Sequence, residues 1–259
     1  MIDNQLPKNG YFKAEGKAEI NYPLKFWKLD VILIRSGMVE YKEALEIQRI
    51  IHNLRKNNEI PNTLWLLEHE PVITFGRRGN LENLVVPEDY LKEIGINIYY
   101  VERGGDITYH GPGQLIGYLF FKINGLNEIR SFVRNLEKSI ISGLKELNIN
   151  AKQIENYTGV WVGNNKICAI GIAVKDWITF HGFALYIDPI YEHFNLIIPC
   201  GIKDKGITSI YKEVGIKDRK LVENSIINGF KQVFNIKFKE IELSEILKKE
   251  VKIYGNKRT

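Results

Sequence analysis

The stretch RGGDITYHGPGQLIGYLFFKI, residues 103–123, joins a glycine-rich segment to a long apolar run. The apolar run predicts a strand, and the glycines before it let the main chain lie close to a ligand and offer amide N–H groups as donors. Their spacing excludes both the dinucleotide-binding fingerprint and the Walker phosphate loop. We therefore predict a binding loop beside a strand, with Arg103, Tyr109 and His110 as walls or polar contacts of a site.

Outward from this stretch, the other strands and helices fall into groups. Apolar patterning predicts strands at 27–37, 63–70, 96–102, 115–123, 159–162, 166–174 and 178–187. Helical spacing of apolar residues predicts helices at about 39–56, 129–147, 222–233 and 243–251. Because the strands are grouped rather than strictly alternating with helices, we predict an α/β fold of the α+β kind, a mixed sheet packed with helices.

Composition narrows the class of protein. The chain has 259 residues, 44% of them hydrophobic, and a net charge of +5 that is spread along the sequence. We predict a polar extension over 1–25 and one domain over 26–259. The absence of a concentrated basic stripe argues against nucleic acid, and the absence of an apolar run of about 18 residues argues against a membrane span. Two cysteines suggest no disulfide framework, so a cytoplasmic location is expected.

The strand 166–174 follows a predicted hairpin turn at 163–165, where glycine and asparagine tolerate positive φ. Strict alternation places Lys166 on one side with Cys168, and Ala169 and Gly171 on the other. The second side is nearly bare, so a ligand or another segment of backbone can approach it closely. Partial burial of Lys166 is expected to lower its pKa, although a lysine beside a turn is more often simply solvated.

The two cysteines differ in their surroundings. Cys200 lies between a proline and a glycine where an apolar run ends, and the nearby Lys203 and Lys205 favour a thiolate. Cys168 lies inside an apolar strand, where cysteine behaves as a small hydrophobic residue. Cys200 is therefore the better candidate for a nucleophile, with a purely structural role equally compatible with the pattern.

The histidines show no metal-ligand spacing, so we predict no metal. His110 and His181 each precede a glycine near a strand end, and these two are expected in a pocket. His52 lies on the predicted helix 39–56, where a position at the surface or edge is expected.

Several segments together resemble one enzyme family. They are LLEHEPVITFGRRG (66–79), RGGDITYHGPGQ (103–114), KICAIGI (166–172) followed by HGFAL (181–185), and PCGIKDKGITS (199–209). In order and spacing they are similar to the lipoyl(octanoyl) transferases that use octanoyl-acyl carrier protein. The similarity covers roughly residues 41–210 and implies the fold shared by biotin and lipoate protein ligases.

The resemblance also implies roles for individual residues. Cys200 would be the acyl-thioester nucleophile, and Lys166 would lower the pKa of its thiol and act as general base. The substrate site would be lined by Arg103, Gly104, Gly105, Asp106, Ile107, Thr108, Tyr109, His110, Ala169, Ile170, Gly171, Gly182, Phe183 and Ala184, with His181 as a possible addition. No cofactor is implied, because exchange between thioesters is nearly isoenergetic.

The implied reaction moves an octanoyl group from its carrier protein to a lysine on lipoyl domains of 2-oxoacid dehydrogenase complexes and on the glycine cleavage H protein. Three other functions remain open on the residues alone. They are an ATP-dependent lipoate or biotin ligase on the same fold, a cysteine hydrolase using Cys200 with His110 or His181 and Asp106, and a non-catalytic acyl-binding or protein-binding module. Only the transferase predicts an octanoyl adduct on Cys200 that passes to a lipoyl domain.

Overall fold

The computed structural model describes residues 31–198 and 205–254. Its strands are β1 (Val31–Val39), β2 (Asn62–His69), β3 (Val72–Phe75), β4 (Asn97–Tyr100), β5 (Ile107–His110), β6 (Gln114–Phe120), β7 (Lys152–Ile154), β8 (Tyr157–Val162), β9 (Asn165–Lys175), β10 (Ile178–Tyr186), β11 (Gly206–Ile207) and β12 (Phe238–Glu240). The helices are α1 (Tyr41–Lys56), η1 (Leu81–Asn83), α2 (Glu88–Glu93), α3 (Leu126–Glu146), α4 (Tyr191–Phe194), α5 (Ile210–Val214), α6 (Arg219–Phe234) and α7 (Leu243–Tyr254). The predicted extension over 1–25 lies outside the described residues.

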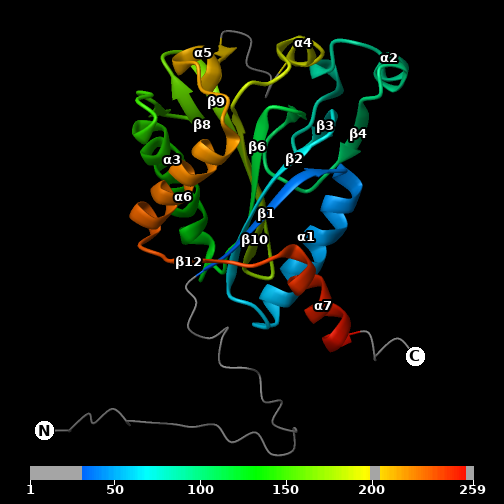
Figure 1. Ribbon diagram of the computed structural model, residues 1–259. Helices are drawn as coiled ribbons and strands as arrows, with labels where there is room; N and C mark the ends of the chain where they lie inside the picture. The colour runs from blue at the N-terminus through cyan, green and yellow to red at the C-terminus, as the bar shows by residue number, and fades with distance from the viewer. Residues whose placement is uncertain (1–30, 199–204, 255–259) are drawn as a thin grey trace, which may run out of the picture.

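A nine-stranded mixed sheet forms the centre of the molecule, in the order β12-β1-β2-β6-β10-β9-β8-β7, with β11 paired to β9. Helices α3 and α6 pack together against one face, and α1 and α7 lie on the other (Figure 1). The small sheet β4-β3-β5 lies on the α1 side and shares its apolar core. Both faces of the central strands are thus covered, which is why β1 and β6 are apolar without a clear alternation.

Most of the predicted elements are confirmed, with boundaries shifted by a few residues. The elements that were not predicted are all short: β7, β11, β12, η1, α2, α4 and α5, and two strands around the glycine-rich stretch. Strand β3 was not predicted, and β5 lies inside the stretch predicted as a binding loop. Each has only four residues and borders glycine or proline, so neither offers enough length for periodicity to show.

The hairpin of β8 and β9 is confirmed, with Gly163 at φ +57° in its turn. Its register contains a β-bulge, because Trp161 lies opposite Lys166 while Val160 lies opposite Cys168. The extra residue, Ile167, interrupts the alternation along β9. The predicted placement of Lys166 on one face with Cys168 is therefore not what the structure shows: Cys168 packs in the core under α3, and Lys166 lines a pocket together with Ala169.

Two further features of the described residues bear on the predictions. His52 is buried rather than at the surface, and its Nε2 lies 3.0 Å from the carbonyl oxygen of Lys175, because α1 packs tightly against the sheet. No helix in the described part of the chain has both the length and the apolar character needed to cross a membrane.

Candidate functional site

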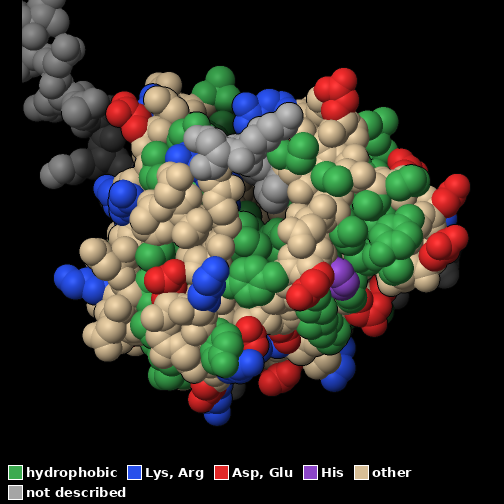
Figure 2. All heavy atoms as spheres, turned by 90° about the horizontal axis from the view of Figure 1, so that it is seen from above, with side chains coloured by type: hydrophobic (Ala, Val, Ile, Leu, Met, Phe, Trp, Pro, Cys, Tyr) green, Lys and Arg blue, Asp and Glu red, His purple; other side chains and the backbone are tan. Residues whose placement is uncertain are grey.

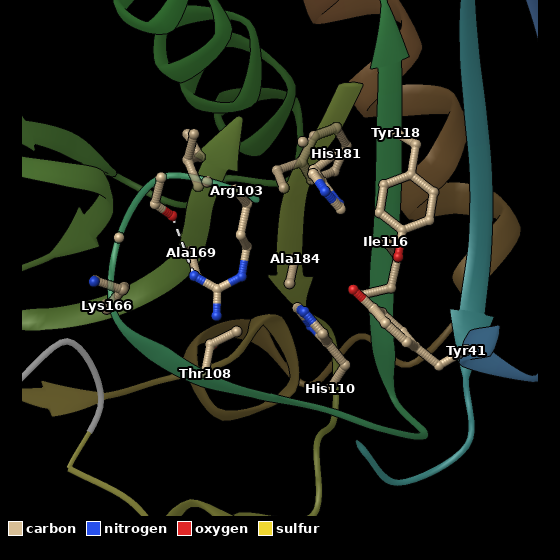
Figure 3. Close-up of a pocket in the computed structure, with 16 residues that line it drawn as sticks. Tyr41, Arg103, Thr108, His110, Ile116, Tyr118, Lys166, Ala169, His181 and Ala184 are labelled. Atoms are coloured by element: carbon tan, nitrogen blue, oxygen red, sulfur yellow. Dashed lines mark hydrogen bonds between the residues drawn. The ribbon is translucent and has the colours of Figure 1, made fainter. Parts of the chain in front are cut away.

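A pocket lies on the α1 side of the central sheet, between the strands β9 and β10 and the segment 103–110 (Figure 3). Its floor consists of small residues that face one another across the sheet. Ala169 pairs with Ala184, and Gly171 pairs with Gly182. The two alanines leave a shallow apolar trough. The two glycines allow close packing instead: a Cβ at Gly171 would meet Gly104, and a Cβ at Gly182 would meet Gly117. Close packing and the trough together explain the nearly bare strand face in the sequence.

The glycine-rich segment lies directly on this floor. The amide N–H of Gly104 donates to the carbonyl oxygen of Ile172 at 2.8 Å, which ties the segment to β9. A Cβ at Gly171 would lie 2.8 Å from the carbonyl oxygen of Gly104 and 3.2 Å from Cδ of Arg103. Gly171 is therefore required for the close approach of the two backbones, and the segment 103–105 forms a wall over the trough.

Arg103 is a fixed part of this wall. Its side chain is buried, its Nε and Nη2 atoms donate to Thr74 of β3, and its Nη1 donates to the carbonyl oxygen of Gly104. These hydrogen bonds hold the guanidinium between the small sheet and the pocket. Its positive charge also disfavours protonation of His110 and His181, whose pKa values are lowered chiefly by burial.

Lys166 lies at one end of the pocket (Figure 3). It is 6% exposed, and its Nζ lies 4.8 Å from the centroid of the Trp161 ring. Strand β11 pairs with this part of β9, and the N–H of Thr208 donates to the Lys166 carbonyl oxygen at 2.9 Å. The chain that follows residues 199–204 is therefore anchored on the strand that carries Lys166.

Cys200, the predicted nucleophile, lies outside the described residues. The residue before that gap is also anchored: the N–H of Ile198 donates to the carbonyl oxygen of Asn83 at 2.7 Å. Asn83 in turn donates through its side chain to the carboxylate of Asp106, which also accepts the N–H of Asn80 at 2.8 Å. Ile198 is thus linked through Asn83 to Asp106 in the glycine-rich segment, and Thr208 is linked directly to β9.

Cys168 lies near the N-terminal end of β9 and is fully buried. Burial raises the pKa of its thiol well above the ordinary range. A thiol that is held protonated and covered by the core is unreactive, so Cys168 is a structural residue, as its sequence context predicts.

The opposite end of the pocket is polar and aromatic. Tyr41 of α1, His110 of β5, Tyr118 of β6 and His181 of β10 meet there (Figure 3). Behind them His69 donates through Nδ1 to the carbonyl oxygen of Val39 and accepts the hydroxyl of Tyr118 on Nε2 at 2.6 Å. Burial lowers the pKa of His69 to about 4, so its ring is neutral, in agreement with that pair of hydrogen bonds.

The structure brings most of the predicted site residues together. Those that line the pocket are Lys166, Arg103, Gly104, Gly105, Thr108, His110, Ala169, Ile170, Gly171, His181, Gly182, Phe183 and Ala184. Asp106, Ile107 and Tyr109 do not line it. Because β5 alternates, Ile107 and Tyr109 enter the core on the far side, and Asp106 holds the segment 80–83 instead. The substrate contacts of these residues stay predictions.

Three lining residues were missed by sequence reasoning: Tyr41, Ile116 and Tyr118. Ile116 and Tyr118 reach the pocket because β6 pairs with β10, where they lie opposite Ala184 and Gly182. The apolar run 115–123 gave no signal, since a strand covered on both faces does not reveal which residues face a ligand. Tyr41 begins α1, and nothing in its local sequence distinguishes it from a core residue.

A second, more open cavity of about 530 Å³ adjoins the pocket. It shares Gly104, Gly105, Lys166, Ile170 and Gly171 with the pocket and is otherwise lined by residues of α3, of β8 and of the segment before it, and by Arg78, Asp106 and Ile172. Lys166 therefore lies where the two spaces meet.

The surface around η1 and α2 has a mixed character. Leu81, Val85, Tyr90 and Ile94, in or beside these helices, and Tyr100 at the end of β4 are exposed. Figure 2 shows hydrophobic side chains gathered where α2 lies, with Asp and Glu along the rim of this surface.

Comparison with known proteins agrees with this architecture. Residues 40–239 match the family model described as the lipoyl protein ligase A/B catalytic domain. The octanoyltransferase of Caldicellulosiruptor saccharolyticus is 48% identical over 86% of this chain and 97% of its own length. The octanoyltransferase of Desulforamulus reducens is 42% identical over 86% of this chain and its full length.

Two solved structures have the same fold. Lipoate-protein ligase A bound with ATP superposes with a TM-score of 0.68 at 17% identity, over 88% of this chain and 94% of that chain. The bipartite lipoate protein ligase of Thermoplasma acidophilum, studied with its E2 lipoyl domain, gives a TM-score of 0.69 at 17% identity, over 88% of this chain and 93% of that chain. At these identities the likeness concerns the fold alone, and it confirms the predicted lipoate protein ligase-like fold.

Proposed function

Because the chain belongs to the lipoyl protein ligase A/B catalytic family and its close relatives are octanoyltransferases, we propose that it takes an octanoyl group from octanoyl-acyl carrier protein. The protein is an octanoyltransferase, an acyltransferase of protein lipoylation. The acceptor is the ε-amine of a lysine on a lipoyl domain. We infer that these domains are those of 2-oxoacid dehydrogenase complexes and the glycine cleavage H protein.

One observation carries this proposal: the apolar trough of Ala169 and Ala184 ends at Lys166. An unbranched acyl chain matches a trough that lacks bulky side chains, and burying it contributes binding energy with each methylene. A buried lysine at the end of that trough suits chemistry at the acyl carbonyl. The second cavity, which meets the pocket at Lys166, gives the attacking amine a separate approach.

The first half of the reaction would form an acyl-enzyme on Cys200. Its thiolate attacks the thioester carbonyl of the donor, a new carbon–sulfur bond forms, and the bond to the carrier thiol breaks. The ammonium group of Lys166 would stabilise the thiolate, whose pKa in free cysteine is about 8.5. The carrier thiolate that leaves takes up the proton of the Lys166 ammonium, which becomes neutral, so bonds and charges balance without ATP.

The second half would transfer the acyl group to nitrogen. The acceptor amine attacks the Cys200 thioester, the carbon–nitrogen bond forms, and the cysteine leaves as a thiolate. The amine must lose a proton in this step, and Lys166 in its neutral form would accept it as general base. The same lysine would then return as the ammonium that stabilises the released thiolate, which closes the cycle.

Intact mass spectrometry tests the proposal. The protein is incubated with octanoyl-acyl carrier protein without ATP, and then with a lipoyl domain. We expect one octanoyl adduct on the wild type, its transfer to the lipoyl domain, and no adduct on Cys200→Ala. Cys168→Ala is the matched control and should keep the adduct, because its thiol is buried in the core.

Three outcomes would contradict the proposal. A requirement for ATP and free octanoate would indicate a ligase, and release of free acid without transfer would indicate a hydrolase. The absence of any covalent adduct on the folded wild type would indicate a binding module.

A further inference from the structure

The end of the pocket farthest from Lys166 contains buried polar atoms that the fold leaves unsatisfied. Among the described residues, Nδ1 of His110 and Nε2 of His181 have no partner within hydrogen-bond distance, and both residues line the pocket. Each ring has one polar neighbour, Gln114 for His110 and Glu102 for His181, and the interaction with it opposes the lowering of the pKa by burial. His110 is 9% exposed and His181 is 2% exposed. A buried polar atom without a partner is rare, and in a pocket it indicates a bound water or a polar ligand group.

The backbone at His181 supports a specific purpose for its ring. His181 lies within β10 at φ +57°, in the left-handed region that residues other than glycine seldom adopt. Its amide N–H is held by the side chain of Gln48 at 3.2 Å. The strained conformation turns the imidazole toward the pocket, where its Nε2 stays 3.8 Å from the carboxylate of Glu102, beyond hydrogen-bond distance.

The two rings act here as neutral polar groups. Burial lowers the pKa of both, and the described residues contain no group of histidine, cysteine and carboxylate side chains that could hold a metal ion. A neutral imidazole has one donor and one acceptor nitrogen, so each can bind a water molecule. Tyr41 and Tyr118 complete the boundary of this end (Figure 3).

We propose that His110 and His181 form a polar stop that sets the upper limit of acyl-chain length. The inference rests on the proposed function. With the thioester at Lys166, the alkyl chain follows the trough of Ala169 and Ala184 toward the two histidines. The proposal requires that an eight-carbon chain end before the two rings and leave a water molecule bound to them, whereas a longer chain must displace that water.

The balance of two effects predicts a sharp limit. In an open apolar slot, each added methylene improves binding by about fourfold. At the polar stop, a methyl group that displaces water leaves an imidazole nitrogen unpaired, which reduces binding by about fivefold or more. The gain from one methylene is therefore cancelled, and a second extra methylene, which meets both rings, is rejected.

Chain-length profiles test the proposal. We would measure kcat/KM for hexanoyl, octanoyl, decanoyl and dodecanoyl carrier protein with the wild type, His110→Leu and His181→Asn. Leucine replaces the unsatisfied nitrogen with apolar surface of similar size, and asparagine tolerates the left-handed backbone while freeing space. We expect the decanoyl-to-octanoyl ratio to rise about tenfold in both variants.

Tyr99→Phe is the matched control. Tyr99 of β4 does not line the pocket, and its hydroxyl donates to a carboxylate oxygen of Glu40 at 3.2 Å. The chain-length profile of this variant should equal that of the wild type. Unchanged decanoyl-to-octanoyl ratios in two folded histidine variants would overturn the proposal.

A comparison on the wild type keeps the proposal testable if the variants fail to fold. An 8-hydroxyoctanoyl chain and a nonanoyl chain have the same length, but only the first ends in a group that can hydrogen bond to the histidines. We expect the hydroxylated chain to be preferred by about fivefold. A preference for nonanoyl would contradict the polar stop. Failure of the proposed function is distinct, because then no chain of any length would form an adduct on Cys200.

Discussion

The two ends of the pocket are built on the same pair of strands and yet differ in chemistry. At one end β9 carries Lys166, a buried basic side chain beside the second, open cavity. At the other end β10 carries His181, which meets His110 and two tyrosines in a closed polar cluster. Between them lie the small residues of the trough.

Under the proposed function, this difference separates reaction from recognition. In the proposed mechanism Lys166 changes its protonation state, and it adjoins open space where substrates and protons can exchange. The histidine end must not change, and burial keeps its rings neutral. If the account is correct, substitutions at the lysine end lower the rate for every chain, and substitutions at the histidine end change which chain is preferred.

The largest expected effect comes from removing the lysine. Lys166→Ala should lower kcat/KM for octanoyl transfer by about 10³-fold, within the range that general acid–base groups contribute. Lys175→Ala, at the exposed far end of β9, is the control and should be near wild type. Steady-state assays with carrier protein and lipoyl domain measure both. If kcat/KM of Lys166→Ala fell by less than tenfold, Lys166 would not be a catalytic residue.

The histidine end should make stability depend on pH. The pKa of His69 falls to about 4 in the folded protein, against about 6.5 when unfolded, so the unfolded state binds more protons between these values. Stability should be constant above about pH 7 and fall by up to about 1.4 kcal/mol per pH unit below pH 6.5 for this group. In His69→Gln, the change in unfolding free energy per pH unit, measured by urea unfolding at several pH values, should be smaller by that amount. Equal slopes would mean that His69 is not held neutral.

The floor between the ends should tolerate no added carbon at Gly171. Gly171→Ala places a Cβ 2.8 Å from the Gly104 carbonyl oxygen, so the segment 103–105 must move. We expect about 1–3 kcal/mol of destabilisation and weaker binding of the acyl donor. Gly37→Ala, where a Cβ would have no neighbour within 4 Å, is the control. Urea unfolding measures the loss of stability, and KM for the donor measures the weaker binding. Wild-type values of both in Gly171→Ala would show that the segment 103–105 does not pack closely on β9.

A smaller effect is expected from Asp106, which acts through other residues. Asp106→Asn weakens its hydrogen bonds to Asn80 and Asn83, and Asn83 anchors Ile198, two residues before Cys200. We expect kcat to fall by about tenfold with an unchanged KM for the donor, since only the placement of the nucleophile changes. Asp89→Asn, on the exposed surface of α2, is the control. A raised KM with normal kcat would instead make Asp106 a substrate contact.

The sequence was informative where motifs and long periodic segments occur. Lys166, the glycines around it and the histidines of the two short motifs could be placed in one pocket before the fold was known, because the motifs matched a family. The face of Lys166 could not be predicted correctly, since a β-bulge at Ile167 depends on the pairing of β9 with β8. Tyr118 likewise reaches the pocket only through the pairing of β6 with β10.

These omissions share a physical cause. Which side of a buried strand faces a ligand is decided by what packs on each side, and that is a long-range property. The same holds for β5, whose alternation separates His110 from Tyr109. The local sequence predicted the same role for His110 and Tyr109, because both lie in one glycine-rich stretch. In the structure His110 lines the pocket and Tyr109 lies in the core.

The most direct test of the two-ended pocket is a crystal structure of the protein after reaction with octanoyl-acyl carrier protein. The account predicts density for an octanoyl chain attached to Cys200, with its carbonyl beside Lys166, its methylenes over Ala169 and Ala184, and an ordered water between its methyl end and the rings of His110 and His181. A chain that runs into the second cavity, or one whose methyl end contacts both rings with no water, would contradict it.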